Sequence, residues 1–457
     1  MLETGVAIRI LNVAEAQATI LRREAIDHAA ISPAMAAGIR RVFGEDLSPA
    51  AVVDRILADV RQRGDAAVRE YTRRIDGVDL ADARVSDDEM EAAWAETPQR
   101  LRDALARAVE RIHAFHEREP RGSWIDWRDN EALGQIVRPI ERVGLYVPAG
   151  ASPLPSSLLM AAIPARVAGV EEIVLCTPPD ATGRANATTL AAARLVGITR
   201  AFKIGGAQAV AALAYGTESV PAVDKIVGPG NPFVVLAQKA VFGTVGIANL
   251  PGPTETLLIA DDSANPAWTA ADLLAQSEHV MGTAILLTSS RPLAEAVGRE
   301  IAAQVADLRW RDGILASLAA NGGIVITDSI DQALDLANAF APEHLCLLTR
   351  DPWRLVGRVR HAGGIFVGEA SSEALGDYIY GPSHIMPTSR TARFTSPIHV
   401  RDFLKVISVF GASLPVHNDL APDAIEIAEA EGLTAHAAAL RQRLETADGS
   451  GADGRYD

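Results

Sequence analysis

The sequence predicts an α/β protein with two doubly wound, parallel-sheet (Rossmann-like) units, a helical N-terminal region and a helical C-terminal tail. From residue 142 onward, short apolar runs of strand length alternate with segments of helical apolar spacing, and a second such series starts near residue 256. Parallel strands are buried on both faces and need crossover helices, so this alternation is typical of doubly wound sheets. We expect four segments: a largely helical N-terminal region (1–140), a first α/β unit (141–250), a second α/β unit (251–395), and a C-terminal helical segment with a frayed tail (396–457).

The individual elements follow from the same pattern in chain order. Residues 51–71 and 87–117 carry apolar residues at helical spacing among many charges, which is typical of solvent-facing helices. In the first unit we expect strands at 142–148, 172–176, 201–206 and 225–227, and helices at 158–170, 189–196 and 207–215. In the second unit we expect strands at 256–260, 284–288, 323–327, 344–348 and 364–368, and helices at 268–277, 292–305 and 330–339. Apolar spacing predicts a last helical stretch at 421–444.

Composition and charge exclude several classes of protein. The 457 residues are 48% hydrophobic and 22% charged, which excludes wholesale disorder, collagen and coiled coil. The net charge is −15 and no Lys/Arg run offers a basic patch, so we expect no nucleic-acid partner. No apolar run reaches the ~18 residues of a membrane span, and no secretory signal is visible, so we expect a cytoplasmic protein with no membrane partner. Cys176 and Cys346 each lie in an apolar run and are expected to be buried thiols.

The common nucleotide-binding and catalytic motifs are absent from the sequence. It contains no GxGxxG after a strand, no GxxxxGK[ST], no HExxH and no GxSxG. Two weaker features remain, because the turns at 205–206 and 228–231 each close a strand and open a helix, where a phosphate can approach the backbone. For the second turn, simple helix capping by Asn231 with Pro232 at the first helical position is at least an equal explanation.

Polar residues at the ends of expected elements are the stronger signal. They form four pairs: Gln276 and His279, Glu343 and His344, Asp377 and His384, Glu431 and His436. Each histidine taken singly is more often a satisfied core or surface residue than a ligand, but a Gln, two His and an Asp would suit an oxygen- and nitrogen-rich zinc site. Spacing does not bring positions 276, 377 and 436 together. The residues alone therefore predict an α/β protein with a candidate His/Asp metal site and a Glu–His pair.

Eight stretches together resemble the histidinol dehydrogenase family. They are RVGLYVP (142–148), GGAQA (205–209), VDKIVGPGN (223–231), AADLLAQSEH (270–279), APEHL (341–345), GDY (376–378), TARF (391–394) and EGLTAH (431–436). The likeness covers nearly the whole chain after Arg138, in the family's order. It implies a zinc-containing homodimer of histidine biosynthesis that oxidises L-histidinol to L-histidine through the aldehyde, using two NAD in succession.

The resemblance also implies roles for individual residues. The resemblance implies one zinc per active site, with the ligands Gln276, His279, Asp377 and His436. These four residues would also contact the substrate. The implied acid–base pair is Glu343 and His344. The other implied contacts are Thr254, His344, His384 and Glu431 with the substrate, and Tyr146, Gln208 and Asn231 with NAD. In the family the C-terminal segment serves the other subunit's site, so Glu431 and His436 would act in trans. A neutral imidazole suits removal of the alcohol proton, so we expect His344 to be the base and Glu343 to activate water for the second oxidation.

Three departures from the family pattern bear on the substrate. Thr254 stands where Ser is usual, Val280 where an acidic or small residue is common, and Ser383 where Asn is frequent. The extra methyl of Thr254 narrows its rotamers and the pocket. A paralogous zinc- and NAD-dependent dehydrogenase of another small hydroxylated compound is therefore the alternative among enzymes.

Two alternatives from other classes also follow from the sequence. A non-catalytic metal- or nucleotide-binding module is one, and the presence of both Glu343 and His344 argues against it. Thiol-based aldehyde oxidation by Cys346 is the other, and the apolar run around Cys346 argues against it because a buried thiol is poorly ionised.

Overall fold

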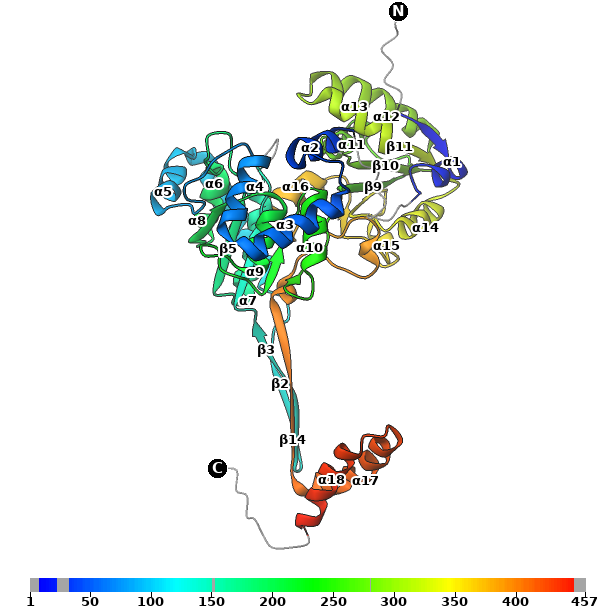
Figure 1. Ribbon diagram of the computed structural model, residues 1–457. Coiled ribbons are helices and arrows are strands. Elements are labelled where there is room, and N and C mark those ends of the chain that lie inside the picture. Colours follow the sequence, from blue (N-terminus) through cyan, green and yellow to red (C-terminus); the bar gives the residue numbers. More distant parts are fainter. Residues whose placement is uncertain (1–7, 23–32, 150–152, 280, 448–457) are drawn as a thin grey trace, which may run out of the picture. The chain divides into compact units, whose positions relative to one another are not determined.

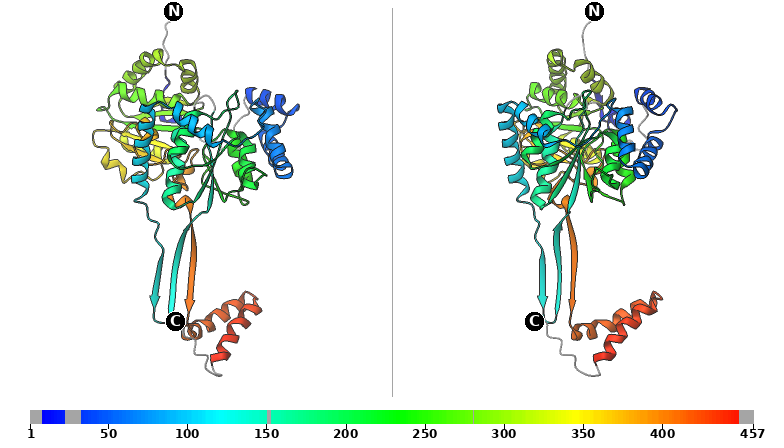
Figure 2. Two further views of the ribbon diagram at one scale, coloured as in Figure 1. Left: turned by 90° about the vertical axis from the view of Figure 1, so that its left-hand side faces the viewer. Right: turned by 60° about the vertical axis from the view of Figure 1, so that its left-hand side comes forward.

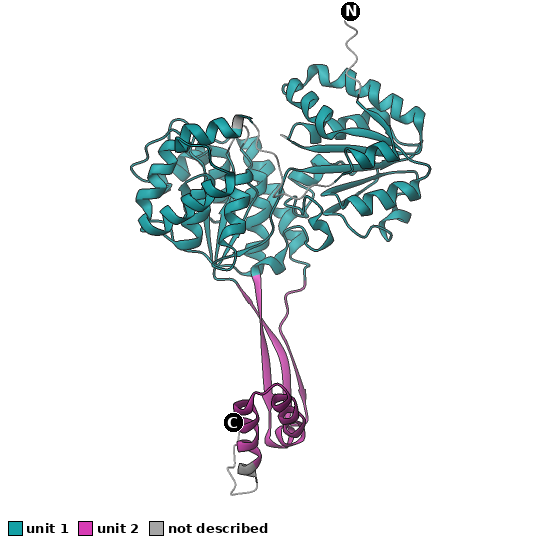
Figure 3. Cartoon of the chain, turned by 45° about the vertical axis from the view of Figure 1, so that its right-hand side comes forward, with its two compact units in different colours: residues 1–119, 140–403 teal, residues 120–139, 404–457 magenta. Residues whose placement is uncertain are grey.

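The computed structural model describes residues 8–22, 33–149, 153–279 and 281–447. The chain divides into two compact units (Figure 3). Unit 1 comprises residues 1–119 and 140–403, and unit 2 comprises residues 120–139 and 404–457. Most of the expected C-terminal frayed tail, residues 448–457, lies outside the described residues.

The first parallel sheet of unit 1 has the strand order β6-β5-β4-β7-β8 (Figure 1). Its strands are β4 (Arg142–Tyr146), β5 (Glu172–Thr177), β6 (Arg200–Lys203), β7 (Lys225–Val227) and β8 (Gly246–Ile247). Its crossover helices are α7 (Pro155–Ala168), α8 (Ala187–Leu195), α9 (Gly206–Tyr215) and α10 (Pro232–Val241). Asn231 caps α10 by accepting from the N–H groups of Phe233 and Val234, as its position before Pro232 predicts.

The second parallel sheet has the order β1-β11-β10-β9-β12-β13. Its strands are β1 (Ile10–Asn12), β9 (Glu255–Ala260), β10 (Thr283–Thr288), β11 (Gly323–Ile326), β12 (His344–Leu348) and β13 (Gly364–Val367). Its helices are α1 (Val13–Ala18), α11 (Pro266–Ser277), α12 (Arg291–Gln304), α13 (Arg311–Asn321), α14 (Ile330–Phe340), α15 (Trp353–Val356) and α16 (Glu373–Tyr378). Along β9, Leu258 packs with α11–α13 on one face, and Leu257 and Ile259 pack with α1, α14 and α15 on the other. This sheet is therefore doubly wound, as predicted.

The N-terminal region is not a separate helical body. Its helices are α2 (Pro33–Phe43), α3 (Pro49–Arg63), α4 (Asp65–Ile75), α5 (Asp87–Glu96) and α6 (Gln99–His116). Val53, Ile56 and Val60 of α3 share one hydrophobic cluster with α9 and α10, so α3 covers the first sheet (Figure 1). Residues 10–12 instead pair with β11 at the edge of the second sheet. A three-residue strand has too little pattern to be found by periodicity, because its signal comes only from the strand it pairs with.

Unit 2 contains strands that the expected helical segments did not include. β14 (Leu404–Ala412), β3 (Glu131–Pro139) and β2 (Trp124–Arg128) form an antiparallel sheet in the order β14-β3-β2, and they run side by side in Figure 2. The helices α17 (Leu414–Ala430) and α18 (Thr434–Ala447) follow. The largely helical region 1–140 and the C-terminal segment 396–457 thus also contribute strands, which the sequence analysis did not locate. Their pairing joins segments far apart in the chain, and strand alternation with helices does not reveal such pairs.

The expectation that both cysteines are buried thiols agrees with the described structure. Cys176 and Cys346 are free and buried. Among the described residues, no helix combines the length and the apolarity that crossing a bilayer requires.

The turn after β7 has a backbone conformation that only glycine adopts without strain. Gly228 has φ +132°, and a Cβ there would lie 2.0 Å from the carbonyl oxygen of Tyr146. Gly228→Ala is expected to lower the free energy of unfolding by at least the ~1–3 kcal/mol typical of backbone strain, measured by urea titration. Gly38→Ala is the matched control, because Gly38 lies in α2 with nothing near its Cβ position, and it should be neutral or stabilising. Equal free energies of unfolding for wild type and Gly228→Ala would contradict the claim that this turn requires glycine at position 228.

Candidate active site

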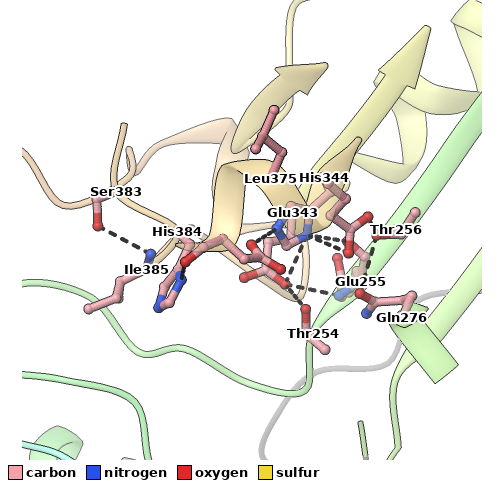
Figure 4. Close-up of polar contacts among 12 residues, drawn as sticks. Thr254, Glu255, Thr256, Gln276, Glu343, His344, Leu375, Ser383, His384 and Ile385 are labelled. Carbon is pink, nitrogen blue, oxygen red and sulfur yellow. Dashed lines mark hydrogen bonds and ion pairs between the residues drawn. The ribbon is translucent and has the colours of Figure 1, made fainter. Parts of the chain in front are cut away.

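The candidate site lies at the amino-terminal edge of the second sheet (Figure 4). Thr254 precedes β9, and Glu343 precedes His344, the first residue of β12. The parallel register pairs His344 with Thr256. Because neighbouring parallel strands begin at the same edge, these groups converge although almost ninety residues separate the two strands in the chain.

The two nitrogens of the His344 imidazole have different partners. Its Nδ1 lies 3.1 Å from the backbone oxygen of Glu255, so Nδ1–H donates to that carbonyl. Its Nε2 is buried without a hydrogen-bond partner in the part of the chain that the structure describes, and lies 3.5 Å from Oδ1 of Asp377. The tautomer with a proton on Nδ1 leaves a lone pair on Nε2. The ring is therefore oriented as a base whose active atom is Nε2.

Glu343 is buried beside His344 and is hydrogen-bonded on Oε2. The hydroxyl of Thr254 donates to Oε2 at 2.6 Å, and the N–H of Glu255 donates at 2.9 Å. Burial raises the pKa of Glu343 to about 8, although the charge of His344 and these hydrogen bonds lower it. Burial opposes charging of His344, but the charges of Glu373 and Glu343 outweigh it and raise the pKa of His344 well above its usual value.

The helix α16 adds two carboxylates on the other side of His344. Asp377 and Glu373 lie four residues apart, and their ligand atoms and those of His344 lie within 4.8 Å of one another. Glu373 is buried, which raises its pKa to about 7. The hydroxyl of Thr256 donates to its Oε2. The two carboxyl groups of α16 and the imidazole of His344 form a set of oxygen and nitrogen donors that suits a divalent cation.

The expected zinc ligands Gln276 and His279, at the end of α11, differ in their burial. Gln276 is buried in the last turn of α11; its Oε1 lies 3.3 Å from the hydroxyl of Thr256, and its Nε2 has no partner among the described residues. His279 lies two residues beyond the helix end and is exposed, whereas Gln276 lies within the helix. Desolvation of the ring lowers the pKa of His279, and the charges of Asp377 and His344 act on it in opposite directions. The ring is therefore within electrostatic reach of both.

The residues expected to line the substrate pocket are engaged with the protein. The hydroxyl of Thr254 is taken by Glu343. Nδ1 of His384 donates to the carbonyl of Asp377 at 2.6 Å, and its Nε2 lies 2.9 Å from the hydroxyl of Ser157, on α7. Ser383 is buried and donates to the carbonyl of Met160 at 3.2 Å.

The remaining site residues lie outside this cluster. Glu431 follows α17, His436 lies in α18, and both are exposed residues of unit 2. The substrate and zinc roles assigned to them stay predictions. Val280 lies outside the described residues.

The expected cofactor residues lie at the carboxyl edge of the first sheet. The hydroxyl of Tyr146 accepts from the N–H of Gly206 at 3.2 Å. Gln208 is fully buried, its Nε2 lies 3.5 Å from Asp76, and its Oε1 has no partner within the described ranges. Such an acceptor fits a hydroxyl or amide donor of a dinucleotide. Asn231 uses its side-chain oxygen as a helix cap, so the capping explanation of that turn holds.

Comparisons with known proteins identify the family. The family model "Histidinol dehydrogenase" matches residues 43–444. A protein of Deinococcus radiodurans named histidinol dehydrogenase is 51% identical over 440 residues, which are 96% of this chain and 100% of that protein. The chain belongs to the histidinol dehydrogenase family. The resemblance inferred from the eight sequence stretches is thus confirmed.

Further members of the histidinol dehydrogenase family support this assignment and the fold. A Moorella thermoacetica protein of that name is 50% identical over 400 residues, covering 87% of this chain and 94% of its own length. The crystal structure of histidinol dehydrogenase from Elizabethkingia anophelis matches with a TM-score of 0.87 at 32% identity, covering 97% of this chain and 99% of that chain. The predicted α/β fold class is thereby confirmed.

Sequence reasoning missed several groups that contact the predicted site residues. They are the backbone carbonyl of Glu255, the side chains of Thr256 and Glu373, and the carboxylate of Asp76. Glu373 lies one helical turn before Asp377 and so shares its helix face, and Thr256 lies two residues after Thr254 and so shares its strand face. This spacing could have indicated that Glu373 and Thr256 belong to the site. For Asp76 the chain offered none, because its contact with Gln208 spans the N-terminal helices and α9.

The burial of Asp76 gives a pH-dependent prediction. Burial raises the pKa of Asp76 to about 6 from an unfolded value of 3.8, so its acid form favours the folded state. That stabilisation is fully present below pH 3.8 and is lost as the pH rises through about 6. Asp76→Asn removes the cost of the charge and should add about 1–2 kcal/mol to the free energy of unfolding at pH 8, and less at pH 5.

Urea titrations at the two pH values measure this difference. Asp79→Asn is the control, because Asp79 is an exposed aspartate three residues further along, and it should change stability equally little at both. If Asp76→Asn raised the free energy of unfolding equally at pH 5 and pH 8, the explanation that the charged form of Asp76 destabilises the folded state would be contradicted.

Proposed function

We propose that this protein oxidises L-histidinol to L-histidine through the aldehyde, in histidine biosynthesis, with NAD and one zinc per active site. The observation that carries the proposal is the buried Glu343–His344 pair, in which the carbonyl of Glu255 fixes Nδ1 of His344 and Nε2 faces Asp377. The family membership of the chain supports the substrate. NAD would accept a hydride in each of the two oxidations.

His344 would remove the hydroxyl proton in the first oxidation. Its Nδ1–H stays on the carbonyl of Glu255, so Nε2 is the atom that takes the proton. The same carboxylates that raise the pKa of His344 keep the ring charged until a cation offsets them. A cation at Asp377 would therefore favour the neutral imidazole that a base requires.

Glu343 would act in the second oxidation, where water must add to the aldehyde. Its raised pKa lets this buried carboxyl exchange a proton near neutral pH. Thr254 and the N–H of Glu255 hold Oε2 in place, so the carboxyl is oriented before water arrives. The division of labour assigns the alcohol proton to His344 and the water proton to Glu343.

Gln276, His279, Asp377 and His436 would hold the zinc. The ion would mainly orient the amine and imidazole nitrogens of the substrate and secondarily polarise it. Gln276 offers one buried amide atom without a partner in the described chain, and Asp377 is held ionised beside His344, which lowers its pKa against the effect of burial. The ionised carboxylate of Asp377 fits a cation ligand, and the amide of Gln276 would fit one once its oxygen, rather than the unpaired Nε2, is turned toward the ion.

Thiol catalysis by Cys346 is disfavoured. The side chain is fully buried, and burial with the charge of Glu373 raises the pKa of Cys346 well above its usual value. A protonated thiol is a poor nucleophile at neutral pH.

We further propose a homodimer in which unit 2 acts in trans. All five residues of β2 are exposed. Large apolar side chains of the sheet are also exposed: Trp124, Ile125, Trp127, Leu133, Val406, Ile407 and Phe410. A three-stranded sheet needs an apolar face packed against something to be stable. A second copy is the occupant that accounts both for this surface and for the proposed roles of Glu431 and His436, which the same unit carries.

The half-reactions test the acid–base assignment. Wild type should form about two NADH per L-histidinol, since alcohol and aldehyde oxidation each release one hydride. His344→Asn should slow alcohol oxidation by roughly 10²–10⁴-fold. Glu343→Gln should slow oxidation of L-histidinaldehyde more than oxidation of the alcohol. Stopped-flow NADH formation from each substrate measures the two steps separately.

The control for this experiment is His361→Asn, an imidazole outside the cluster, which should keep both rates. Turnover of other short hydroxy compounds in preference to L-histidinol would favour the paralogue instead. An equal loss of both half-reactions in the two variants would show that the proposed division of roles is wrong.

Mixed dimers test the action of unit 2 in trans. His436→Ala and His279→Ala should each be inactive, because each removes a proposed zinc ligand. In a mixed dimer both defects fall in one site and the other site is intact, so activity should return to about half of wild type per mixed dimer. Activity after subunit exchange measures this, with exchange followed by tagged subunits. No recovery after confirmed exchange would mean that His436 serves its own chain.

A further inference from the structure

The unpaired atom of the Gln276 amide is its nitrogen, whereas a cation would need its oxygen. Oε1 lies 3.3 Å from the hydroxyl of Thr256, while Nε2 is buried and has no partner among the residues described. An NH₂ group has no lone pair to give to a metal, whereas an amide oxygen has two. In this orientation the only amide atom free for a ligand cannot act as one.

The hydroxyl of Thr256 cannot serve both of its neighbours as donor. It has a single proton, and its Oγ1 contacts Oε1 of Gln276 (Figure 4) as well as Oε2 of Glu373. A carboxylate is an acceptor only, and it is a stronger acceptor than an amide oxygen. Once the proton goes to Glu373, the oxygens of Thr256 and Gln276 face each other without a hydrogen between them.

A half-turn of the amide satisfies all three groups. Nε2–H of Gln276 then donates to Oγ1 of Thr256, whose O–H donates to the carboxylate of Glu373, and Oε1 becomes the unpaired atom. The two amide ends are nearly equal in size, so this turn needs no repacking. All three side chains are almost fully buried, at 1% exposure for Gln276, 0% for Thr256 and 4% for Glu373, so water does not offer the unpaired N–H an alternative.

We propose that Thr256 and Glu373 form a relay that turns the amide of Gln276 so that its oxygen, not its nitrogen, faces the bound zinc. The relay rests on the zinc site of the proposed function, and assigns two positioning residues behind one of its ligands. In the ionised form of Glu373 the direction of the hydrogen bonds is set at that end of the relay, because an ionised carboxylate can only accept. Partners of this kind commonly orient metal ligands and tune affinity.

Replacing Glu373 by Gln should reverse the donor–acceptor direction of the hydrogen bonds along the relay. In Glu373→Gln, a new side-chain NH₂ can donate to Thr256, whose own proton is then free to go to Oε1 of Gln276. That arrangement uses up the oxygen that the metal needs. Thr256→Val removes the middle of the relay at nearly constant volume, and Thr256→Ser restores the hydroxyl.

Zinc affinity measured with the metal alone tests the relay without relying on turnover. Metal-free full-length protein is titrated with zinc in competition with a chromogenic chelator. Thr256→Val and Glu373→Gln should bind zinc roughly 10–100-fold more weakly than wild type, and Thr256→Ser should return to near the wild-type value. Thr269→Val is the matched control, since Thr269 is a buried threonine of α11 whose hydroxyl bonds only to the carbonyl of Asn265 among the described residues. It should bind zinc like wild type.

The absorption spectrum of cobalt-substituted protein gives a second readout. Loss of the amide oxygen should change the ligand-field bands of Thr256→Val and Glu373→Gln, but not those of Thr256→Ser or Thr269→Val. If Thr256→Val does not fold, as judged by circular dichroism, Thr256→Ala decides the question, because it removes the hydroxyl without touching Glu373, which itself belongs to the candidate cation cluster.

The outcomes separate the relay from the zinc site itself. Wild-type zinc affinity and an unchanged cobalt spectrum in folded Thr256→Val and Glu373→Gln would overturn the relay, provided that His279→Ala still loses zinc. Failure of wild type to bind zinc at one ion per chain would instead overturn the zinc assignment, and the relay with it.

Discussion

A buried imidazole can move protons only if one ring nitrogen is fixed and the other is left free. In this protein the carbonyl of Glu255 fixes Nδ1 of His344, and the pairing of β12 with β9 sets the distance between them. That bond depends on the register of two central strands, not on a flexible side chain. The other contacts of the site follow from it, because Thr254, Thr256 and Glu343 are carried by the same two strand starts.

One loop connects this strand edge to the first α/β sheet. Ser383 and His384 bind α7 of the first sheet through Met160 and Ser157. A few residues later, the N–H of Ser389 donates to Oε1 of Glu255 at 2.9 Å, next to the carbonyl that holds His344. The loop therefore ties the acid–base edge of the second sheet to a crossover helix of the first. The Glu343–His344 pair at the amino edge of one sheet and the glycine turns at the carboxyl edge of the other are held in one unit by such contacts.

The parts that sequence reasoning predicted have local signals, and the parts that it missed do not. The strands and helices of both parallel sheets follow from alternating apolar runs, and the cap at Asn231 follows from its neighbour Pro232. β1 and the three strands of unit 2 are defined by pairing with distant segments, which periodicity does not report. Motifs located Glu343, His344 and Asp377, but the exposure of His279 and the hydrogen bonds that engage Thr254 and His384 depend on packing.

The proposed exchange of unit 2 makes metal binding and dimerisation parts of one equilibrium. Within the described part of unit 2, the helices share only a small apolar cluster around Ile425, Ala428 and Ala437, and the sheet leaves its large side chains uncovered. A unit with so little core of its own would gain most of its order from the surface of the proposed partner copy. If His436 completes the partner's zinc shell, any ligand that favours the complete shell also favours the dimer, by the same free energy. Zinc affinity would then depend on protein concentration near the dimer dissociation constant, whereas a site completed within one chain would bind zinc equally well at every concentration.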